Sequence, residues 1–437
     1  AMIVCKFGGS SVADAQQIKK VKEILDADAQ RQILVVSAPG KRNSDDVKVT
    51  DLLYQSAEAV ANDENSSEIL DAIEERYTDI LANLQINAEF FTPVFNEVRS
   101  RIEAGEGAVY AASRGEYLSA RLIAEYLGWE FLDTENLIII EADGGVDPIS
   151  YANLSAALEE GTRYVVPGFY GSNTNGMIQT FSRGGSDITG AILSRASGAE
   201  VYENWTDVSG IYRIDPRLVS GAEVIEEMTY QEIRELAGVG AGVFHEEAIA
   251  PVIAVQIPIN VKNTNDPEAA GTWILPESKE TKKRVVGVAA TGGYTRLTIQ
   301  KLMLNKHVGI RRGLLTMMRV FGVKPAFSLF GIDSIVWFFD AKQANEKVVA
   351  AMCDRLADEY SLDSISVATG CAVLGVVGSK INEQPSLVSI ITAALEEQGI
   401  TIHFLNYGSS PTSVLVGVDE IRASEAVAAI YRAIFSE

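Results

Sequence analysis

A segment within the first ten residues has the composition of a phosphate-binding loop. Residues 6–10 read KFGGS and follow a short apolar run. Two glycines let backbone N–H groups approach a phosphate closely, and the lysine is a compact positive charge that can bridge phosphate groups. Alone, the pattern is equally typical of a tight turn between a strand and a helix, and the Walker A spacing is absent from the sequence.

A second segment, residues 182–187 (SRGGSD), suggests recognition of a carboxylate. Its arginine, Arg183, can pair with a carboxylate through two parallel hydrogen bonds. Helix capping accounts for Ser186 or Asp187, because an apolar helix pattern begins there. Capping does not account for the Arg-Gly-Gly that precedes them, so we favour a binding function for this segment.

Two further segments are weaker when each is considered alone. Residues 37–40 (SAPG) are typical of an ordinary loop. Residues 205–217 combine hydroxyl groups, a carboxylate, an aromatic ring and an arginine, and alone they are typical of a structured loop with an Asp-Pro turn. Both gain weight because each follows a predicted strand.

Alternating strand and helix patterns position these four segments. The predicted strands are residues 2–7, 32–36, 108–111, 131–133, 137–141, 164–167, 200–203, 259–263 and 272–275. The predicted helices are residues 14–27, 50–60, most of 66–103, 116–127, 187–196 and 230–237. The alternation predicts an α/β fold with a mostly parallel sheet covered by helices on both faces. The four segments would converge at the carboxyl ends of its strands, where ligands bind in such folds.

A polar, charged stretch at residues 277–284 reads as a linker to a different region. Beyond it a small β-α-β-β-α-β pattern (α+β) occurs twice, with one strand missing from the second copy and a spare strand at residues 285–289. Inserting the first copy, about 294–369, into the second, about 284–291 plus 370–437, completes the second sheet. This reading counts as separate strands residues 296–300, 364–368 and 372–377.

Composition and charge restrict the partners of the chain. Its 437 residues suggest two to four domains. Charged residues make up 22% of the chain, which is ordinary for a globular protein. The net charge of -22 repels nucleic acid and acidic membranes, so we expect neither as a partner. It repels ATP as well, so a nucleotide site must gather positive charge locally.

Cysteine usage and the lack of targeting patterns favour the cytoplasm. The three cysteines are far apart and odd in number, which fits a reducing compartment and gives no metal-ligand spacing. The start of the chain lacks a signal-peptide pattern, and no apolar run approaches the roughly 20 residues of a membrane span. We therefore expect a cytoplasmic protein.

Taken together, these segments resemble the aspartate kinase family, within the broader amino acid kinase fold. The matching motifs, in family order, are KFGGSSVAD at 6–14, SRGEYLSA at 113–120, FSRGGSDITGA at 181–191, WTDVSGIYRIDPR at 205–217 and KNTNDPEAAGTWI at 262–274. The two small repeats resemble a pair of interleaved ACT domains, which bind amino acids in many biosynthetic enzymes. The resemblance covers essentially the whole chain. It implies a catalytic domain over residues 1–283 and a regulatory region over residues 284–437.

The resemblance also implies roles for individual residues. Those implied to hold the transferring phosphoryl group are Lys6, Gly8, Gly9 and Ser10. Those implied to hold the nucleotide are Thr206, Asp207, Tyr212 and Arg217. Those implied to hold aspartate are Thr50, Glu116, Arg183 and Asp187, and the catalytic residues would be Lys6 and Asp187.

The implied reaction is phosphorylation of the side-chain carboxylate of L-aspartate by ATP with Mg²⁺, giving 4-phospho-L-aspartate. This is the first step of lysine, threonine and methionine biosynthesis. Arg183 suits the α-carboxylate of the substrate, and Glu116 and Asp187 suit its α-ammonium group. The side-chain carboxylate, with a pKa near ~4, is ionised at neutral pH, so no general base is required. No residue is assigned as a metal ligand, and His245 beside two glutamates reads as structural.

The sequence departs from the family in two places. Gly242 stands where many members carry a lysine near the nucleotide phosphates. Residues 330–334 resemble the effector loop of the first ACT domain, but Pro411 and Thr412 follow the corresponding loop of the second, where an acidic residue is common. The identity of the effector, lysine or threonine, is therefore open. We expect feedback inhibition by an end product and a homodimer or larger assembly, because ACT domains commonly pair edge strands between chains.

Two rival functions remain. A kinase of another carboxylate, such as glutamate, is opposed by residues 183–187 together with the ACT-like repeats. A catalytically silent amino-acid sensor would account for Gly242, but Lys6, Arg183 and Asp187 are all present. The predicted function is therefore an aspartate kinase regulated by an amino acid.

Overall fold

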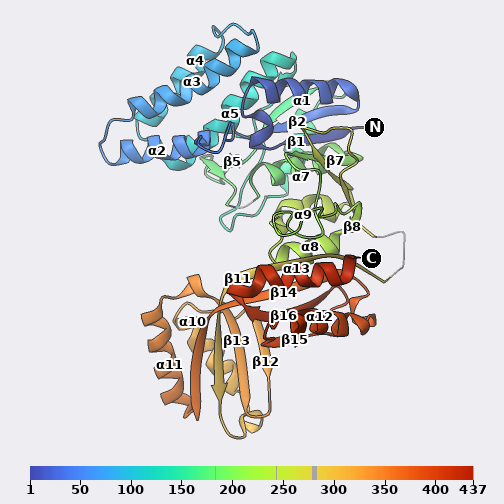
Figure 1. Cartoon of the computed structure of the whole chain (residues 1–437). Helices are drawn as coiled ribbons and strands as arrows, with labels where there is room; N and C mark the ends of the chain where they lie inside the picture. The colour runs from blue at the N-terminus through green and yellow to red at the C-terminus, as the bar shows by residue number, and fades with distance from the viewer. Residues whose placement is uncertain (183, 243, 278–282, 437) are drawn as a thin grey trace. The chain divides into compact units, whose positions relative to one another are not determined.

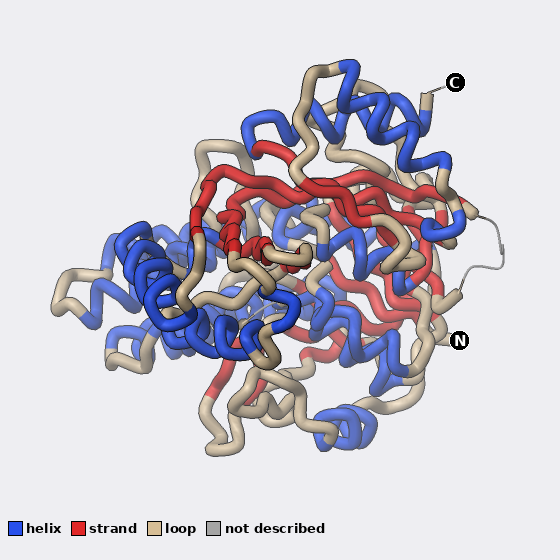
Figure 2. The backbone as a smooth tube through the Cα atoms, turned by 90° about the horizontal axis from the view of Figure 1, so that it is seen from below, coloured by secondary structure: helices blue, strands red, loops and turns tan. Residues whose placement is uncertain are grey.

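The computed structural model describes residues 1–182, 184–242, 244–277 and 283–436, so Arg183 lies outside the described residues. The chain divides into two compact units. The first unit comprises Ala1–Ile211, Val224–Ala237 and Gly242–Glu280, and the second comprises Tyr212–Glu223, Gly238–Ala241 and Thr281–Glu437. Figure 2 shows where helices, strands and loops lie along the described backbone. No helix within the described ranges is both long and apolar enough to cross a bilayer.

The apolar runs of the sequence form the main sheet of the first unit. Among the described residues this sheet has eight strands, in the order β3-β4-β2-β1-β7-β9-β10-β8. Their bounds are β1 Ile3–Phe7, β2 Arg31–Val36, β3 Glu130–Phe131, β4 Tyr164–Pro167, β7 Val201–Thr206, β8 Glu227–Thr229, β9 Ile259–Asn263 and β10 Thr272–Leu275. Neighbouring strands from β3 to β9 are parallel, and β10 is antiparallel to β9. The predicted mostly parallel sheet is confirmed.

Helices cover both faces of the sheet because its central strands are apolar on both sides. The face that carries Cys5 and Phe7 packs against α1 (Ala15–Ala27) and α5 (Ala108–Leu127). The opposite face, with Val4, packs against α7 (Gly185–Ser197). Successive side chains of a strand point to opposite faces, so Lys6 shares the α7 side with Val4. The remaining helices of the unit are α6 Ile149–Ala157, α8 Tyr230–Gly238 and α9 Glu246–Ala254.

A helical insert separates β2 from β3. It consists of α2 (Val49–Ala61), α3 (Ser67–Asn83) and α4 (Phe91–Glu103), followed by α5, and its helices gather at one end of the unit, at the upper left of Figure 1. Aromatic rings of α3 and α4 pack in its core, with Tyr77 and Phe91 at a centroid distance of 5.6 Å. The helical prediction for residues 66–103 is confirmed.

Two predicted strands are wrong. Residues 108–111 form the first turn of α5, and residues 137–141 contribute only isolated bridges, such as Ile139 with Ser172. Both errors have one cause, since a short apolar run fits a buried helix or an irregular segment as well as a strand.

The second unit is built on an antiparallel sheet. Among the described residues it has six strands, in the order β12-β13-β11-β14-β16-β15. Their bounds are β11 Arg284–Gln300, β12 Phe327–Phe330, β13 Ser334–Asp340, β14 Ser364–Ser379, β15 Phe404–Asn406 and β16 Ser413–Asp419. Its helices are α10 Ile310–Val320, α11 Glu346–Tyr360, α12 Ser386–Glu397 and α13 Ala423–Phe435.

The two repeats share their central strands. The spare strand predicted at residues 285–289 pairs with the later half of β14, as the interleaved arrangement requires, with Val288 opposite Val376. The prediction of separate strands is wrong, because β11 and β14 each run unbroken through both repeats. Register shifts near Thr291 and Tyr294 absorb the glycine pair that lies between them, so the strand bends without ending.

A segment from the earlier part of the chain covers the second repeat. Ile214 is buried in the core of that repeat, and Leu218 packs beside it. Arg213 donates from Nη1 to the carbonyl of Val286 at 3.1 Å, and its guanidinium lies over the Phe435 ring at 5.2 Å. Residues 212–223 therefore belong structurally to the second unit.

Candidate active site

The carboxyl ends of the parallel strands bring the predicted segments of the first unit together. The backbone N–H of Gly8, after β1, donates to the carbonyl of Trp205 in β7 at 3.2 Å. On the other side, the N–H of Ser37, after β2, donates to Phe7 at 3.3 Å. The predicted convergence is therefore present for the ends of β1, β2 and β7, while residues 212–217 of the fourth segment belong to the second unit.

Close backbone contact between the loops after β1 and β2 favours glycine at positions 9 and 40. The N–H of Gly40 donates to the carbonyl of Gly9 at 2.9 Å. A Cβ atom at Gly40 would lie 2.8 Å from the carbonyl carbon of Gly9, and a Cβ at Gly9 would lie 3.1 Å from the carbonyl oxygen of Ala38. Side chains at these positions would force the two loops apart. Ser10 follows in a short 3₁₀ turn, Gly9–Val12.

Lys6 and Asp187 form an ion pair beside this loop. The Nζ atom of Lys6 lies 2.8 Å from Oδ1 of Asp187, and their side chains are 11% and 26% exposed. The side-chain amide of Asn204 in β7 donates to the same carboxylate oxygen at 2.8 Å. Asp187 lies in the first turn of α7, where the helix dipole favours a negative charge. The pair thus places a positive charge at the glycine loop, where a phosphate could approach.

Glu116 is a buried carboxylate beside the loop that follows β2. It lies in α5 next to Gly115, where a Cβ atom would be 2.6 Å from that of Ala38. Burial raises the pKa of Glu116 to about 8, against opposition from the N–H groups of Glu116 and Ala38 and the charge of Arg114. Its Oε2 atom is buried and has no hydrogen-bond partner among the described residues. Such an oxygen suits an ammonium group supplied by a ligand.

The other predicted residues differ in how firmly the structure places them at this edge. Thr50 is half-buried in the first turn of α2, next to Val49, whose N–H donates to the carbonyl of Pro39 at 3.2 Å. Thr206 ends β7, and the exposed Asp207 follows it.

Tyr212 and Arg217 belong to the second unit, and so they are not brought to this edge within the first unit. The Arg217 side chain is 87% exposed and pairs with Asp215 at 2.7 Å.

Sequence reasoning missed three residues of this region. Asn204 was a polar residue inside an apolar strand, and Arg76 a charged residue on the apolar face of α3, and both were signals that could have been used. Phe169, which follows β4, adopts a left-handed conformation with φ of 82° beside the start of α7. Nothing in its local sequence indicates that conformation.

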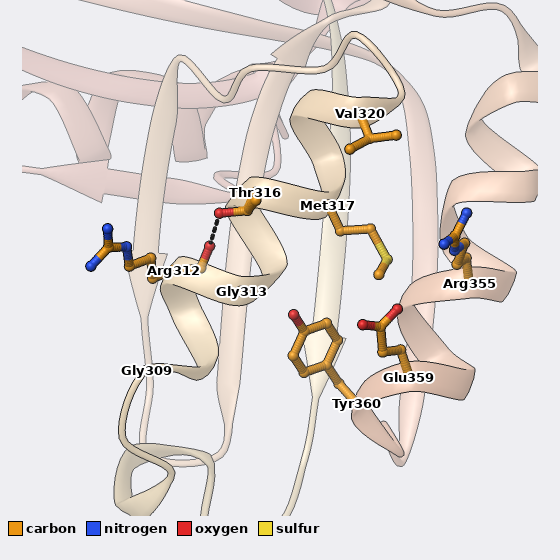
Figure 3. Close-up of a pocket in the computed structure, with 9 residues that line it drawn as sticks. All are labelled: Gly309, Arg312, Gly313, Thr316, Met317, Val320, Arg355, Glu359 and Tyr360. Atoms are coloured by element: carbon orange, nitrogen blue, oxygen red, sulfur yellow. Dashed lines mark hydrogen bonds between the residues drawn. The ribbon is translucent and has the colours of Figure 1, made fainter.

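A metal centre and a surface pocket are two other kinds of ligand site. Among the described residues no group of three histidine, cysteine, aspartate or glutamate side chains is arranged to hold a metal ion. In the second unit a surface pocket of about 440 Å³ lies between α10 and α11, with Met317, Glu359 and Tyr360 facing it (Figure 3). Its charged lining residues, Arg312, Arg355 and Glu359, are exposed. The pocket therefore lacks the buried polar groups that distinguish the edge near Lys6.

Two protein families match parts of this chain. The amino acid kinase family matches residues 1–263, and the ACT domain family matches residues 374–434. Aspartokinase 3 of Bacillus subtilis is 34% identical over 100% of this chain and 99% of its own length.

Solved structures show the same similarity. The crystal structure of Clostridium acetobutylicum aspartate kinase, described as an allosteric enzyme, has a TM-score of 0.88 and 38% identity, covering 99% of each chain. Escherichia coli aspartokinase III, solved with aspartate and ADP, has a TM-score of 0.80 and 26% identity over 100% of both chains. The same E. coli protein was also solved with lysine and aspartate.

Proposed function

We propose that the chain, which belongs to the amino acid kinase family and is an aspartate kinase, carries out its reaction at the strand ends around Lys6, Asp187 and Glu116. The reaction transfers the γ-phosphoryl group of ATP to the side-chain carboxylate of L-aspartate, giving ADP and 4-phospho-L-aspartate. The observation that carries the proposed location is the Lys6–Asp187 pair at 2.8 Å beside the glycine loop.

In this site the phosphoryl group lies against the glycine loop. Backbone N–H groups of Gly8, Gly9 and Ser10, with the ammonium group of Lys6, neutralise the charge that develops on the transferring oxygens. Glu116 binds the α-ammonium group of aspartate through its unpartnered Oε2 atom. Arg183, predicted from the sequence alone, binds the α-carboxylate. The side-chain carboxylate is then left free as the nucleophile, already ionised.

Mg²⁺ and the nucleotide complete the proposal. Mg²⁺ would accompany the phosphates of ATP and neutralise part of their charge, and the Asp187 carboxylate beside the glycine loop would help to hold it. Thr206 and Asp207 contact the nucleotide at the end of β7, and the roles of Tyr212 and Arg217 stay predictions. Gly242 has open space around the position of a Cβ atom, so the first atom of a side chain meets no clash there.

We further propose an inhibitory amino acid at the second unit, with lysine favoured over threonine because the E. coli relative was solved with lysine. The loop at residues 330–334 is the proposed place. Its Asp333 carboxylate accepts from the N–H of Met303 at 2.8 Å, which holds the loop against the end of β11. A cytoplasmic location stays a prediction.

A homodimer through the edge of the second unit is the proposed assembly. Strand β12 is an edge strand of the described sheet. Apolar side chains beside it are exposed, with Phe330 at 53% and Ile332 at 72%. An apolar edge strand with a free backbone side favours pairing with a second copy.

The activity is tested by incubating the purified protein with L-aspartate, ATP and Mg²⁺ and trapping the acyl phosphate with hydroxylamine. We expect turnover with aspartate, much less with L-glutamate, and suppression by lysine. Faster turnover with glutamate would overturn the substrate assignment. No turnover in a folded preparation would favour the silent sensor, and Gly242→Lys would then be the first variant to assay.

A further inference from the structure

The guanidinium group of Arg76 joins three separate backbone segments of the first unit. Arg76 lies in α3 of the helical insert, and its side chain is 5% exposed. Its Nη2 atom donates to the carbonyls of Gly40 at 2.9 Å and Ala13 at 3.2 Å, and its Nη1 atom donates to the carbonyl of Val47 at 3.1 Å. The Asp46 carboxylate lies 3.3 Å from Nη1. None of these partners belongs to α3.

Two of the three carbonyls, those of Ala13 and Gly40, belong to residues next to the glycine loop at residues 8–10. Ala13 ends the short 3₁₀ turn that begins at Gly9. Gly40 donates its own N–H to Gly9 at 2.9 Å, so the residue that Arg76 holds is also the residue that supports the loop. Because the two backbones are in contact, a shift of Gly40 moves Gly9 with it.

The third carbonyl lies at the start of α2, which carries Thr50. Val47 is two residues before that helix, and Val49 at its first position donates to the carbonyl of Pro39 at 3.2 Å. Arg76 thus fixes the loop after β1, the loop after β2 and the helix start relative to one another. The first is proposed to hold phosphate and the last aspartate.

Burying this charge is costly, which indicates that its position matters. Burial lowers the pKa of Arg76, and the neighbouring Asp46 carboxylate opposes that effect. Hydrogen bonds from Arg42 hold the pKa of Asp46 well below its usual range, so the carboxylate stays charged as a counter-ion. An apolar side chain of similar volume would commonly give equal or greater stability at a buried site. The rigid guanidinium fork serves the three carbonyls from two separate nitrogen atoms, which the single ammonium nitrogen of a lysine cannot do.

We propose that Arg76 is a positioning residue for phosphoryl transfer, which sets the separation between the glycine loop and the start of α2. This role rests on the proposed function, because the two elements matter together only if one holds the phosphoryl group and the other the acceptor. Misplacement of reacting groups by about 1 Å costs on the order of 10²-fold in rate. Loss of Arg76 should therefore act on kcat and leave substrate affinity largely intact.

The first test compares Arg76→Met with Arg99→Met. Arg99 lies in α4 of the same insert, and its described partners, Asp71, Glu103 and the carbonyl of Ser67, all lie within the insert. We expect kcat to fall about 10²-fold in Arg76→Met while KM for aspartate and for ATP changes less than about threefold. Arg99→Met should keep the wild-type kcat. Both variants are compared by thermal denaturation.

Chemical rescue separates positioning from a merely structural role. In Arg76→Ala, added methylguanidinium at millimolar concentration should raise kcat in a saturable way, and it should have no such effect on Arg99→Ala. Arg76→Lys, which keeps the charge but loses the fork, should retain a folded protein with kcat lowered about 10-fold.

The outcomes distinguish this proposal from the proposed function. A wild-type protein without kinase activity would refute the function whatever Arg76 does. With an active wild type, wild-type kcat in folded Arg76→Met would overturn the positioning role, as would a loss of activity that only follows a loss of folded protein. If Arg76→Met does not fold, Arg76→Lys decides, and full kcat in that folded variant would overturn the proposal.

Discussion

The two units of this protein differ in whether they bury charged side chains. In the first unit the described buried residues include five acidic or basic side chains, Arg76, Arg114, Glu116, Glu203 and Glu232. In the described part of the second unit the buried polar residues are uncharged, and each ion pair has a partner more than half exposed. Buried charge usually costs stability unless it is paired. In the first unit two of these charges, Arg76 and Glu116, contact the loop that follows β2, whereas the described core of the second unit is apolar.

The largest effect is expected at the centre of the charged region. Lys6→Ala should lower kcat by on the order of 10²-fold or more, because it removes the positive charge at the glycine loop. Lys342→Ala, at an exposed position of the second unit, should leave kcat unchanged. Steady-state assays of both variants check this. Near-wild-type turnover of Lys6→Ala would refute the catalytic role proposed for its charge.

Glu116 should make aspartate binding depend on pH. Its ammonium partner requires the ionised carboxylate, and burial raises the pKa of Glu116 to about 8. The KM for aspartate should therefore fall as pH rises from 6 to 8. Glu116→Gln should raise that KM by about 10- to 100-fold and remove the pH dependence, with little change in KM for ATP. Glu125→Gln, on the exposed side of the same helix, is the control.

The raised pKa of Glu116 also predicts how the free energy of unfolding changes with pH. Between its ordinary pKa of 4.5 and its folded pKa of about 8, the folded protein retains a proton that the unfolded chain releases. The free energy of unfolding should then fall as pH rises through this window, by up to about 1.4 kcal/mol per pH unit from this group. Denaturation of Glu116→Gln should show a shallower pH dependence. An unchanged slope would mean that Glu116 is ionised in the folded protein.

A smaller effect is expected where residues 212–223 cover the second repeat. Arg213→Ala removes a hydrogen bond to Val286 and a cation–π contact with Phe435, and should lower local stability by about 1–2 kcal/mol. Amide hydrogen exchange of the Val288 N–H, which donates to Arg213, reports the change. Arg217→Ala, at an exposed ion pair, should leave this exchange rate unchanged.

The smallest effect on catalysis is expected at the apolar surface of the second unit. Ile332→Asp should shift the protein from dimer to monomer in light scattering while basal kcat stays within about twofold. Ile421→Asp alters an even more exposed isoleucine in the second repeat and should leave the assembly intact. A dimer that persists in Ile332→Asp would show that the two copies of the chain do not pair through this edge.

Local patterns predicted more of this molecule than distant contacts did. The glycine loops and the strand–helix alternation were predictable because each depends on residues near one another in sequence. The role of Arg76 was not, because its partners are backbone carbonyls, which carry no residue signature and lie 29 to 63 positions away. Tyr212 and Arg217 show a second limit. They follow Thr206 closely in sequence, yet they belong to a different compact unit.

Because the two repeats are interleaved, the growing chain can complete the first repeat before the second. The first half of β11 leaves the ribosome early, but its partner Val376 is made roughly 90 residues after Val288. At about 5–20 residues per second this half-strand waits on the order of 5–20 s, while the first repeat can already close around Leu297 and Trp337. We infer that during this interval the growing chain carries the first half of β11 without its β14 partner, bound by no strand of its sheet on that side. Limited proteolysis of the chain truncated after residue 370 should cut residues 284–291 and spare β13, and protection of both would refute this order.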